Sequence, residues 1–422
     1  MMMRATRSIF SLLVVLASGD ALAQEGEGFL DGANVKLNAT NFYYNRDYRS
    51  GVGVGKREEW AQGLLIDARS GYTRGTVGFG LDLLGLGVVK LDGIASENAT
   101  GLLPYDQNGT RHAFGRVAPT VKLRFGPAEV KAGTFLTKDL LLKSNFSRLL
   151  PQTFEGQAAG AKFENSEIGY ARYDRTWIRD GVDRTRLTIT NKDRRFAGSP
   201  ASGGFQMVTW TYKPSADWKL HYEAGELEDI YRQQVFNGAF SHPVGTGKLS
   251  AEVRYFVSDE AGRALAGTVD NRMLNALVSW EVGGQEFAAA YQGLSGDSAM
   301  PFVNGTDGNV FNWTLINDFM ERDERSWQLR YQLDGKKIHA PGLKFLTRYI
   351  HADHAKPTIF DGEGRQWQRD IIISYAFQSE ALRHLSVQWL NGFFRSNYQR
   401  DAEENRLMVT YEIPLWSGRS SQ

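Results

Sequence analysis

The sequence contains no cysteine, no strong excess of charge and, outside its first segment, no long hydrophobic run. Without cysteine, a disulfide framework, thiolate metal ligands and a thiol nucleophile are excluded. The 49 Lys and Arg residues nearly balance the 48 Asp and Glu residues, for a net charge of +1. This balance argues against a general nucleic-acid binder. Because no apolar run approaches about 20 residues, transmembrane helices are excluded for the rest of the chain.

The first 23 residues have the features of a cleavable secretory signal peptide. Arg4 and Arg7 precede an apolar stretch from Ile9 to Ala17, and the small residues of Ala21-Leu22-Ala23 follow. A charged start, a short apolar core and a small-residue exit are typical of exported proteins. We therefore expect residues 1–23 to be removed and residues 24–422 to form the mature protein.

Apolar and polar residues alternate with a period of two along most of the mature chain. Between residues 113 and 125, Val117, Val121 and Leu123 are each followed by a polar, basic or small residue. Such alternation predicts a strand with one apolar and one polar face. The same pattern recurs at residues 249–255, 274–280, 327–331 and 407–415. Helical periodicity is rare, so the sequence predicts an all-β chain.

Short turns alternate with long polar loops between these strands. Residues 126–127 and 283–284 are examples of the turns, and residues 137–155 and 295–325 of the loops. This asymmetry is typical of outer-membrane barrels, which have short periplasmic turns and longer extracellular loops. Eight turns and nine longer connections give 18 strands, and an even number places both termini in the periplasm. A soluble sandwich or propeller is the alternative, but it explains neither the signal peptide nor the asymmetry.

The sequence therefore predicts an 18-stranded antiparallel transmembrane β-barrel in the outer membrane of a Gram-negative bacterium. A sheet in lipid cannot leave an edge of unpaired backbone groups, so it must close on itself. An inward-folded constriction loop completes this prediction. Loop 137–155 carries Leu140, Leu142, Leu149 and Leu150, which are too apolar for a solvent-exposed tip.

Several segments in the same order resemble the OprD family of substrate-specific outer-membrane channels. Among them are "GFLDGANVKLNATNFYYNRDYR" (28–49), "SRLLPQTFEG" (147–156) and "DAEENRLMVTYEIPLW" (401–416). The resemblance implies a monomeric barrel, with a loose trimer as the alternative, and diffusion of small carboxylate-bearing nutrients along a row of basic residues. The expected partners are these anionic solutes, outer-membrane lipid and lipopolysaccharide, and the barrel assembly machinery. No nucleic acid, cofactor or metal is expected.

Side chains at alternate positions of a strand point to opposite faces. This alternation places many basic side chains on the lumenal face. Arginine can grip a carboxylate with two parallel hydrogen bonds, and weak sites spread along a pore release each ion again. The alternative for each residue is an ion pair that only holds the wall together. We expect the pathway to comprise Arg116, Lys122, Arg124, Lys131, Arg254, Arg330, Lys344, Arg348 and Arg406.

The loop at residues 137–155 is the expected constriction, and the resemblance implies that it folds into the pore. Arg148 is its expected charged contact, and pinning of the loop to the wall is the alternative role. Asp297 and Asp307 of the loop at 295–325 are expected opposite it. Acids facing bases would create a transverse field that orients carboxylate or zwitterionic solutes.

Three lumenal positions suggest the substrate class. Where the basic-amino-acid branch of the family carries a Lys and two Args, this chain has Ser374, Gln388 and Leu390. With Phe394 they form a mixed wall that suits an aromatic carboxylate. A porin for basic or other amino acids or peptides is the alternative. An outer-membrane barrel hydrolase is the alternative from another class, but neither G-x-S-x-G nor H-E-x-x-H is present. Residues 417–422 extend beyond Trp416, where barrels of the family end.

Overall fold

The computed structural model describes residues 28–93, 100–107 and 109–418, so the expected signal peptide lies outside the described residues. Within this part, 18 strands form one antiparallel sheet, which confirms the predicted number. They are β1 (Asn34–Tyr48), β2 (Lys56–Arg69), β3 (Val77–Gly93), β6 (Ala113–Phe125), β7 (Ala128–Phe135), β8 (Thr153–Lys162), β9 (Ser166–Trp177), β10 (Phe205–Tyr212), β11 (Trp218–Leu227), β12 (Tyr231–Val244), β13 (Gly247–Glu260), β14 (Asp270–Val282), β15 (Gln285–Ser295), β16 (Arg325–Asp334), β17 (Leu343–Ala355), β18 (Gly364–Ala376), β19 (Leu385–Ser396) and β20 (Ala402–Ser417).

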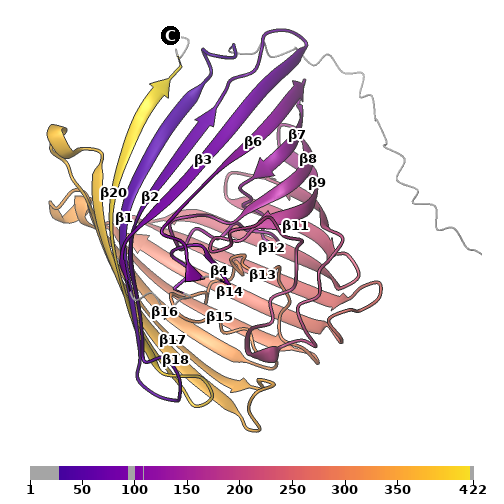
Figure 1. Ribbon diagram of the computed structural model, residues 1–422, viewed down its shortest axis with the longest axis vertical. Helices are drawn as coiled ribbons and strands as arrows, with labels where there is room; N and C mark the ends of the chain where they lie inside the picture. Colours follow the sequence, from indigo (N-terminus) through magenta and orange to yellow (C-terminus); the bar gives the residue numbers. More distant parts are fainter. Residues whose placement is uncertain (1–27, 94–99, 108, 419–422) are drawn as a thin grey trace, which may run out of the picture.

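The sheet closes where its first and last strands meet. β1 pairs antiparallel with β20 from Asn34 opposite Ser417 to Tyr48 opposite Ala402, and Figure 1 shows the yellow β20 beside the indigo β1. Every strand of the barrel therefore has two hydrogen-bonded neighbours. This arrangement satisfies the backbone groups in a hydrocarbon environment. Ser417, the first residue of the expected tail, still belongs to β20.

The two faces of the barrel wall differ as the alternation predicts. On β6, Val117, Val121 and Leu123 point outward and are exposed, whereas Lys122 points inward and is buried. Outward aromatic rings form a continuous row across β16 to β19. The row runs in the order Trp327, Tyr349, Trp367 and Phe393, and the centroids of neighbouring rings lie 5.4–5.7 Å apart. Such a row marks a membrane interface.

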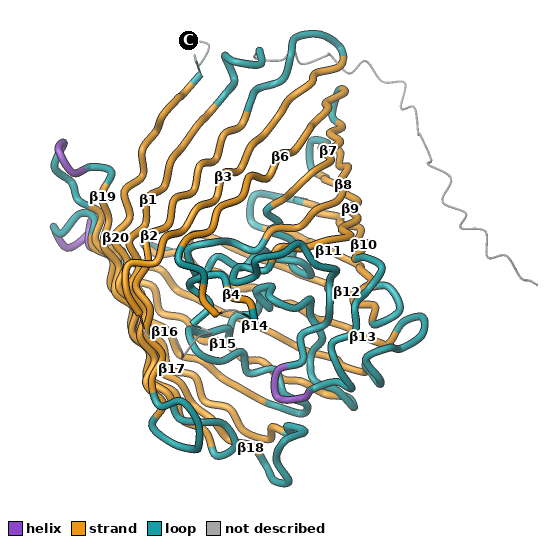
Figure 2. The backbone as a smooth tube through the Cα atoms, viewed as in Figure 1, coloured by secondary structure: helices purple, strands orange, loops and turns teal. Residues whose placement is uncertain are grey.

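Long loops fill part of the barrel interior (Figure 2). Loop 3 (residues 136–152) connects β7 to β8, and it ends earlier than the expected residue 155 because Thr153 already begins β8. Leu142 and Leu150 of this loop are buried. A two-stranded hairpin that the sequence did not predict, β4 (Tyr105–Asp106) and β5 (Gly109–Thr110), lies in the loop after β3. No helix among the described residues is long and apolar enough to cross a membrane.

Candidate functional site

The first half of loop 3 is anchored by a buried carboxylate of the barrel wall. Glu223 projects inward from β11, and its two oxygens accept hydrogen bonds from the backbone N–H groups of Leu140 (2.9 Å) and Leu141 (2.8 Å). His221 lies 2.7 Å from the same carboxylate. Leu141 and Leu142 join a large cluster of buried apolar residues along β8 to β15. Apolar burial and one carboxylate therefore fix this half of the loop.

The second half of loop 3 is held by arginines. Arg116 of β6 donates a hydrogen bond to the backbone carbonyl of Pro151 (2.9 Å). Arg148 donates to the carbonyls of Thr100 (2.7 Å) and of its neighbour Ser147 (2.8 Å). Its guanidinium lies 4.6 Å from the centre of the Tyr44 ring. Neither arginine has an ion pair with any carboxylate that the structure describes. Both the pathway role and the pinning role expected for Arg148 are compatible with these contacts.

Loops 4 (residues 178–204) and 7 (residues 296–324) are tied together by a buried ionic cluster. Arg195 of loop 4 binds Asp318 (2.7 Å) and Glu321 (2.7 Å) of loop 7. Burial disfavours the charge of Arg195, but the two carboxylates outweigh burial and raise the pKa of the guanidinium. Strand parity gives no information about such loop residues, so the sequence did not reveal this cluster. It holds both loops inside the barrel.

These loops and the wall enclose a cavity of about 650 Å³ in the lumen, which we call the lumenal cavity. Seven basic residues line it: Arg46, Lys143, Arg148, Arg179, Lys192, Arg348 and Arg406. Three acidic residues line it: Asp180, Asp307 and Asp318. The lining is therefore cationic, although the whole chain is nearly neutral. Of the predicted site residues, this cavity brings together Arg148, Arg348, Arg406 and Asp307.

Several of these cations are paired with a carboxylate. Arg348 binds Asp370 (2.7 Å). Arg406 and Arg46 share the buried Glu404. Arg46 was not among the predicted residues, although its even position on β1, like that of Lys36, would have placed it inward. Pairing lowers the effective charge of these arginines, but two guanidiniums on one carboxylate still leave an excess positive charge.

Arg148 and Arg179 are the cations of the lumenal cavity that have no ion pair with a carboxylate among the described residues. Burial, together with the positive charge of Arg406, lowers the pKa of Arg148 to about 9. The side chain still carries its proton at neutral pH. Because burial makes the positive charge of Arg148 unfavourable, a nearby anion would stabilise that charge. Arg148 is therefore a partly buried cation of the lumenal cavity without a carboxylate partner among the described residues.

The remaining predicted basic residues lie elsewhere along the inner wall. Four of them are in ion pairs: Lys122 with Asp82 (2.5 Å), Lys131 with Glu129 (2.5 Å), Arg254 with Glu252 (2.8 Å) and Arg330 with Glu286 (2.9 Å). Arg124 instead stacks 4.6 Å above the Tyr72 ring, and Lys344 lies opposite Ser374 in the strand register. These four residues have the ion pairs that a wall role requires, and their pathway role stays a prediction.

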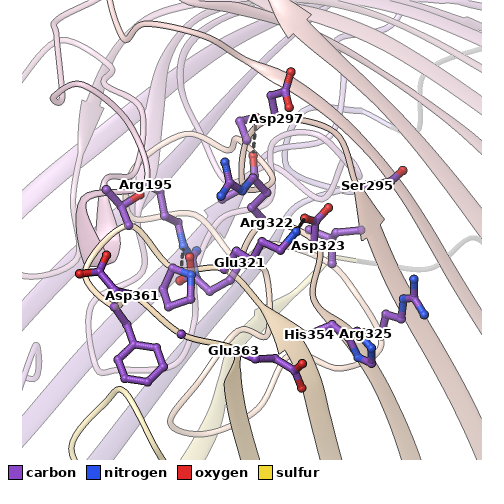
Figure 3. A pocket seen from close by; sticks show the side chains of 18 residues that line it. Arg195, Ser295, Asp297, Glu321, Arg322, Asp323, Arg325, His354, Asp361 and Glu363 are labelled. Carbon is purple, nitrogen blue, oxygen red and sulfur yellow. Dashed lines mark hydrogen bonds and ion pairs between the residues drawn. The ribbon is translucent and has the colours of Figure 1, made fainter.

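The two acids predicted in loop 7 lie at different places. Asp307 lines the lumenal cavity and pairs with Lys143 of loop 3 (3.1 Å). Asp297 is exposed and lines a separate cavity of about 770 Å³ with Ser295, Arg325 and His354 (Figure 3). The structure therefore does not bring Asp297 to Arg148.

The wall at β18 and β19 carries the mixed character expected there. Ser374 lies opposite Gln388 in the register, and Leu390 is buried on the inner face of β19. At Gly392 a Cβ atom would lie 3.1 Å from Ile316 Cδ1, so the glycine lets loop 7 approach the wall closely. Ile316 itself lines the lumenal cavity. Ile316 thus adds an apolar side chain to the cavity that the arginines line.

A closed 18-stranded barrel with a cationic lumen narrowed by loops defines the class of substrate-specific outer-membrane porins. Such a protein is a channel and not an enzyme. Among the described residues, no group of three or more His, Asp or Glu side chains could hold a metal ion. The fold places the protein in the outer membrane of a Gram-negative bacterium, which it crosses many times.

The chain belongs to the OprD family of outer membrane porins, whose family model matches residues 27–415. The porin-like protein GalP of Pseudomonas putida is 32% identical over 420 residues, which cover 97% of this chain and 99% of that protein. Porin D of Pseudomonas aeruginosa is 28% identical, with 93% of each chain covered.

Solved structures agree with this assignment. OccK9 (OpdG) of Pseudomonas aeruginosa has a TM-score of 0.89 at 34% identity. A BenF-like porin from Pseudomonas fluorescens has a TM-score of 0.88 at 33% identity. Pseudomonas aeruginosa OpdK, whose structure was solved with vanillate, has a TM-score of 0.85 at 34% identity. Each similarity covers 92% of this chain and the whole of the other chain.

Proposed function

We propose that this porin admits small carboxylate-bearing nutrients by passive diffusion, and that aromatic acids are its preferred class. One observation carries the proposal. Arg148 stands in the lumenal cavity without a carboxylate partner, and apolar residues line the same cavity. Loop 3 would then be the constriction, with Arg148 as the cation that a passing carboxylate meets.

The lumenal cavity can replace part of the water that an anion loses in a narrow pore. Arg148 offers N–H donors in a planar fork that matches a carboxylate. Arg348 and Arg406 extend the positive potential along the wall, but their bonds to Asp370 and Glu404 weaken their hold on a solute. Weak binding at successive positions allows entry and release.

Apolar and aromatic residues of the loops favour a ring over an aliphatic chain. Trp313, Leu315 and Ile316 of loop 7 and Phe146 of loop 3 line the lumenal cavity. Vanillate, present in the structure of the similar channel OpdK, is an aromatic carboxylate. A ring lying against these residues would leave its carboxylate free to reach Arg148.

The proposal can be tested with purified protein in planar bilayers and in liposomes. Wild-type channels should select anions in a salt gradient, and liposomes should take up benzoate or vanillate faster than arginine. In Arg148→Gln, loss of one charge-assisted contact of about 1.5–3 kcal/mol should reduce aromatic-acid uptake about ten-fold or more. The matched control is Lys131→Gln, because Lys131 is lumenal but already paired with Glu129. We expect this control to change uptake little.

Two outcomes would contradict the proposal. Equal or faster uptake of arginine by the wild type would reject aromatic acids as the preferred class. An unchanged reversal potential and unchanged uptake in Arg148→Gln would reject the role of Arg148, even if the protein conducts ions.

A further inference from the structure

One strand of the barrel presents two arginines to the surrounding membrane. Arg365, Trp367 and Arg369 alternate on the outer face of β18, and Gln366 and Gln368 between them are buried on the inner face. Trp367 belongs to the outward aromatic row. These side chains lie in the half of β18 that follows loop 356–363, one of the loops at the extracellular end. They therefore face the outer leaflet of the membrane.

Arg369 has an amide partner but no carboxylate partner. Its Nη2 atom donates a hydrogen bond to Asn391 Oδ1 on β19 (2.9 Å). In the strand register it lies between Tyr349 of β17 and Phe393 of β19, and its guanidinium is 5.6 Å from the centre of the Phe393 ring. No ion pair involves Arg369 among the residues that the structure describes. It is an exposed cation that lies between two aromatic side chains of the neighbouring strands.

The neighbouring outward arginines differ in this respect. Arg365 is paired with Glu363 (3.2 Å). Arg395 lies on the other side of Phe393, 3.6 Å from the ring centre, and is paired with Glu403 (2.9 Å). The protein thus supplies a counter-charge for these two arginines and none for Arg369.

A row of amides holds Arg369 in place. Asn391 accepts from Arg369 and donates through Nδ2 to Asn405 Oδ1 on β20 (3.1 Å). Asn405 in turn lies opposite Asn45 of β1 in the strand register. Hydrogen bonds therefore link Arg369, Asn391 and Asn405 across β18, β19 and β20 on the outer wall. The amide carbonyl orients the guanidinium without neutralising it.

We propose that Arg369, assisted by Arg395 across Phe393, binds the phosphate group of an anionic glycolipid of the outer leaflet. A charged side chain on the lipid face is unfavourable unless it reaches the interface and finds a partner there. Phosphate oxygens match the planar donor fork of arginine and would complete the missing ion pair. Trp367 and Phe393 would lie beside the sugar and the upper acyl chains. The lipid A part of lipopolysaccharide has this chemistry.

The test is a lipid titration of the full detergent-purified barrel, followed by native mass spectrometry. The probes are bisphosphorylated lipid A and the same lipid A after removal of its phosphates. Wild type should bind the phosphorylated form at least about five-fold more tightly, as expected for one basic side chain at an anionic surface. Arg369→Gln should lose this preference, and Arg369→Lys should keep part of it.

Arg232→Gln is the matched control. Arg232 also points outward near the extracellular end, on β12, but Asp259 lies 3.9 Å from it. This variant should bind both lipids as the wild type does. Equal binding of the two lipids by the wild type would overturn the proposal, and so would unchanged binding by Arg369→Gln. If Arg369→Gln instead dissociates a dimer without altering lipid binding, the patch contacts a second copy of the chain and the lipid site is wrong. If Arg369→Gln fails to assemble, the binding of the two lipids by the wild type and by Arg369→Lys tests the proposed lipid site.

Discussion

The two halves of loop 3 lie against different walls of the barrel and use opposite charges to do so. In the first half, Leu141 and Leu142 are buried and the carboxylate of Glu223 binds two backbone N–H groups. In the second half, Leu149 and Leu150 are buried against β1, β2, β3 and β6, and arginines bind backbone carbonyls. Leucines anchor both halves. The two halves differ in the polar groups that hold them, which are a carboxylate in the first half and guanidinium groups in the second.

The two kinds of side chain differ in the hydrogen-bonding groups that remain free on each. Both oxygens of Glu223 are occupied by the loop and the side chain is fully buried. A guanidinium has five N–H donors, so Arg148 can bind carbonyl groups of the loop region and still offer donors to the cavity. A neutral carbonyl does not cancel its charge. The first half therefore fixes the loop, and the second half supplies the charge.

The largest effect is expected when the apolar anchor of the first half is removed. Leu142 is fully buried, and Leu142→Ala should weaken the packing of loop 3 by about 2–5 kcal/mol. Single-channel recordings should show frequent transitions to a larger conductance as the loop leaves the wall. Heat-dependent mobility in gels should show that the barrel still assembles. A steady wild-type current would mean that Leu142 does not hold the loop.

Removing the charge of the carboxylate anchor should have a smaller effect of the same kind. In Glu223→Gln, one of the two loop N–H groups loses its acceptor, at a cost of about 1.5–3 kcal/mol. Channel noise should rise, whereas ion selectivity should change little because Glu223 is buried. Glu286→Gln is the control, since Glu286 pairs with Arg330 away from loop 3. A selectivity change as large as that of Arg148→Gln would abolish the distinction between the two halves.

A third expected effect is a pH dependence of the first half. Burial, together with the negative charge of Glu223, raises the pKa of Asp139 in loop 3 to about 7. The docked loop thus binds a proton that the released loop, with a pKa near 3.8, does not bind between these values. Docking should weaken as the pH rises from about 4 to about 7 and then stay constant. Channel noise at pH 5 and pH 8 tests this, and Asp139→Asn should remove the difference.

Much of the fold could be predicted because side chains along a strand alternate between two faces with a period of two residues. The even number of 18 strands, which was expected from the turns and longer connections, is confirmed by the sheet. The inward position of Lys122 and the outward position of Val121 are also confirmed. The leucines of loop 3 indicated its burial because apolar residues in a polar loop need a surface to cover.

The contacts of the loops could not be predicted in this way. Arg195 and Asp318 are 123 residues apart, and no local pattern connects them. Asp297 and Asp307 looked alike in the sequence, but of the two only Asp307 lines the lumenal cavity together with Arg148. Parity also shows only that a base points inward. Whether Arg330 meets a solute or Glu286 depends on the register of β15 and β16.

Because β1 must pair with β20, the barrel forms completely or not at all. Until the last strand is present, β1 has no partner on one side, and an open cylinder in hydrocarbon would expose two columns of backbone N–H and C=O groups. The contacts that complete the wall join residues more than 350 positions apart, which makes unassisted closure slow. A chain that lacks this one strand should therefore form no smaller pore and should remain unassembled.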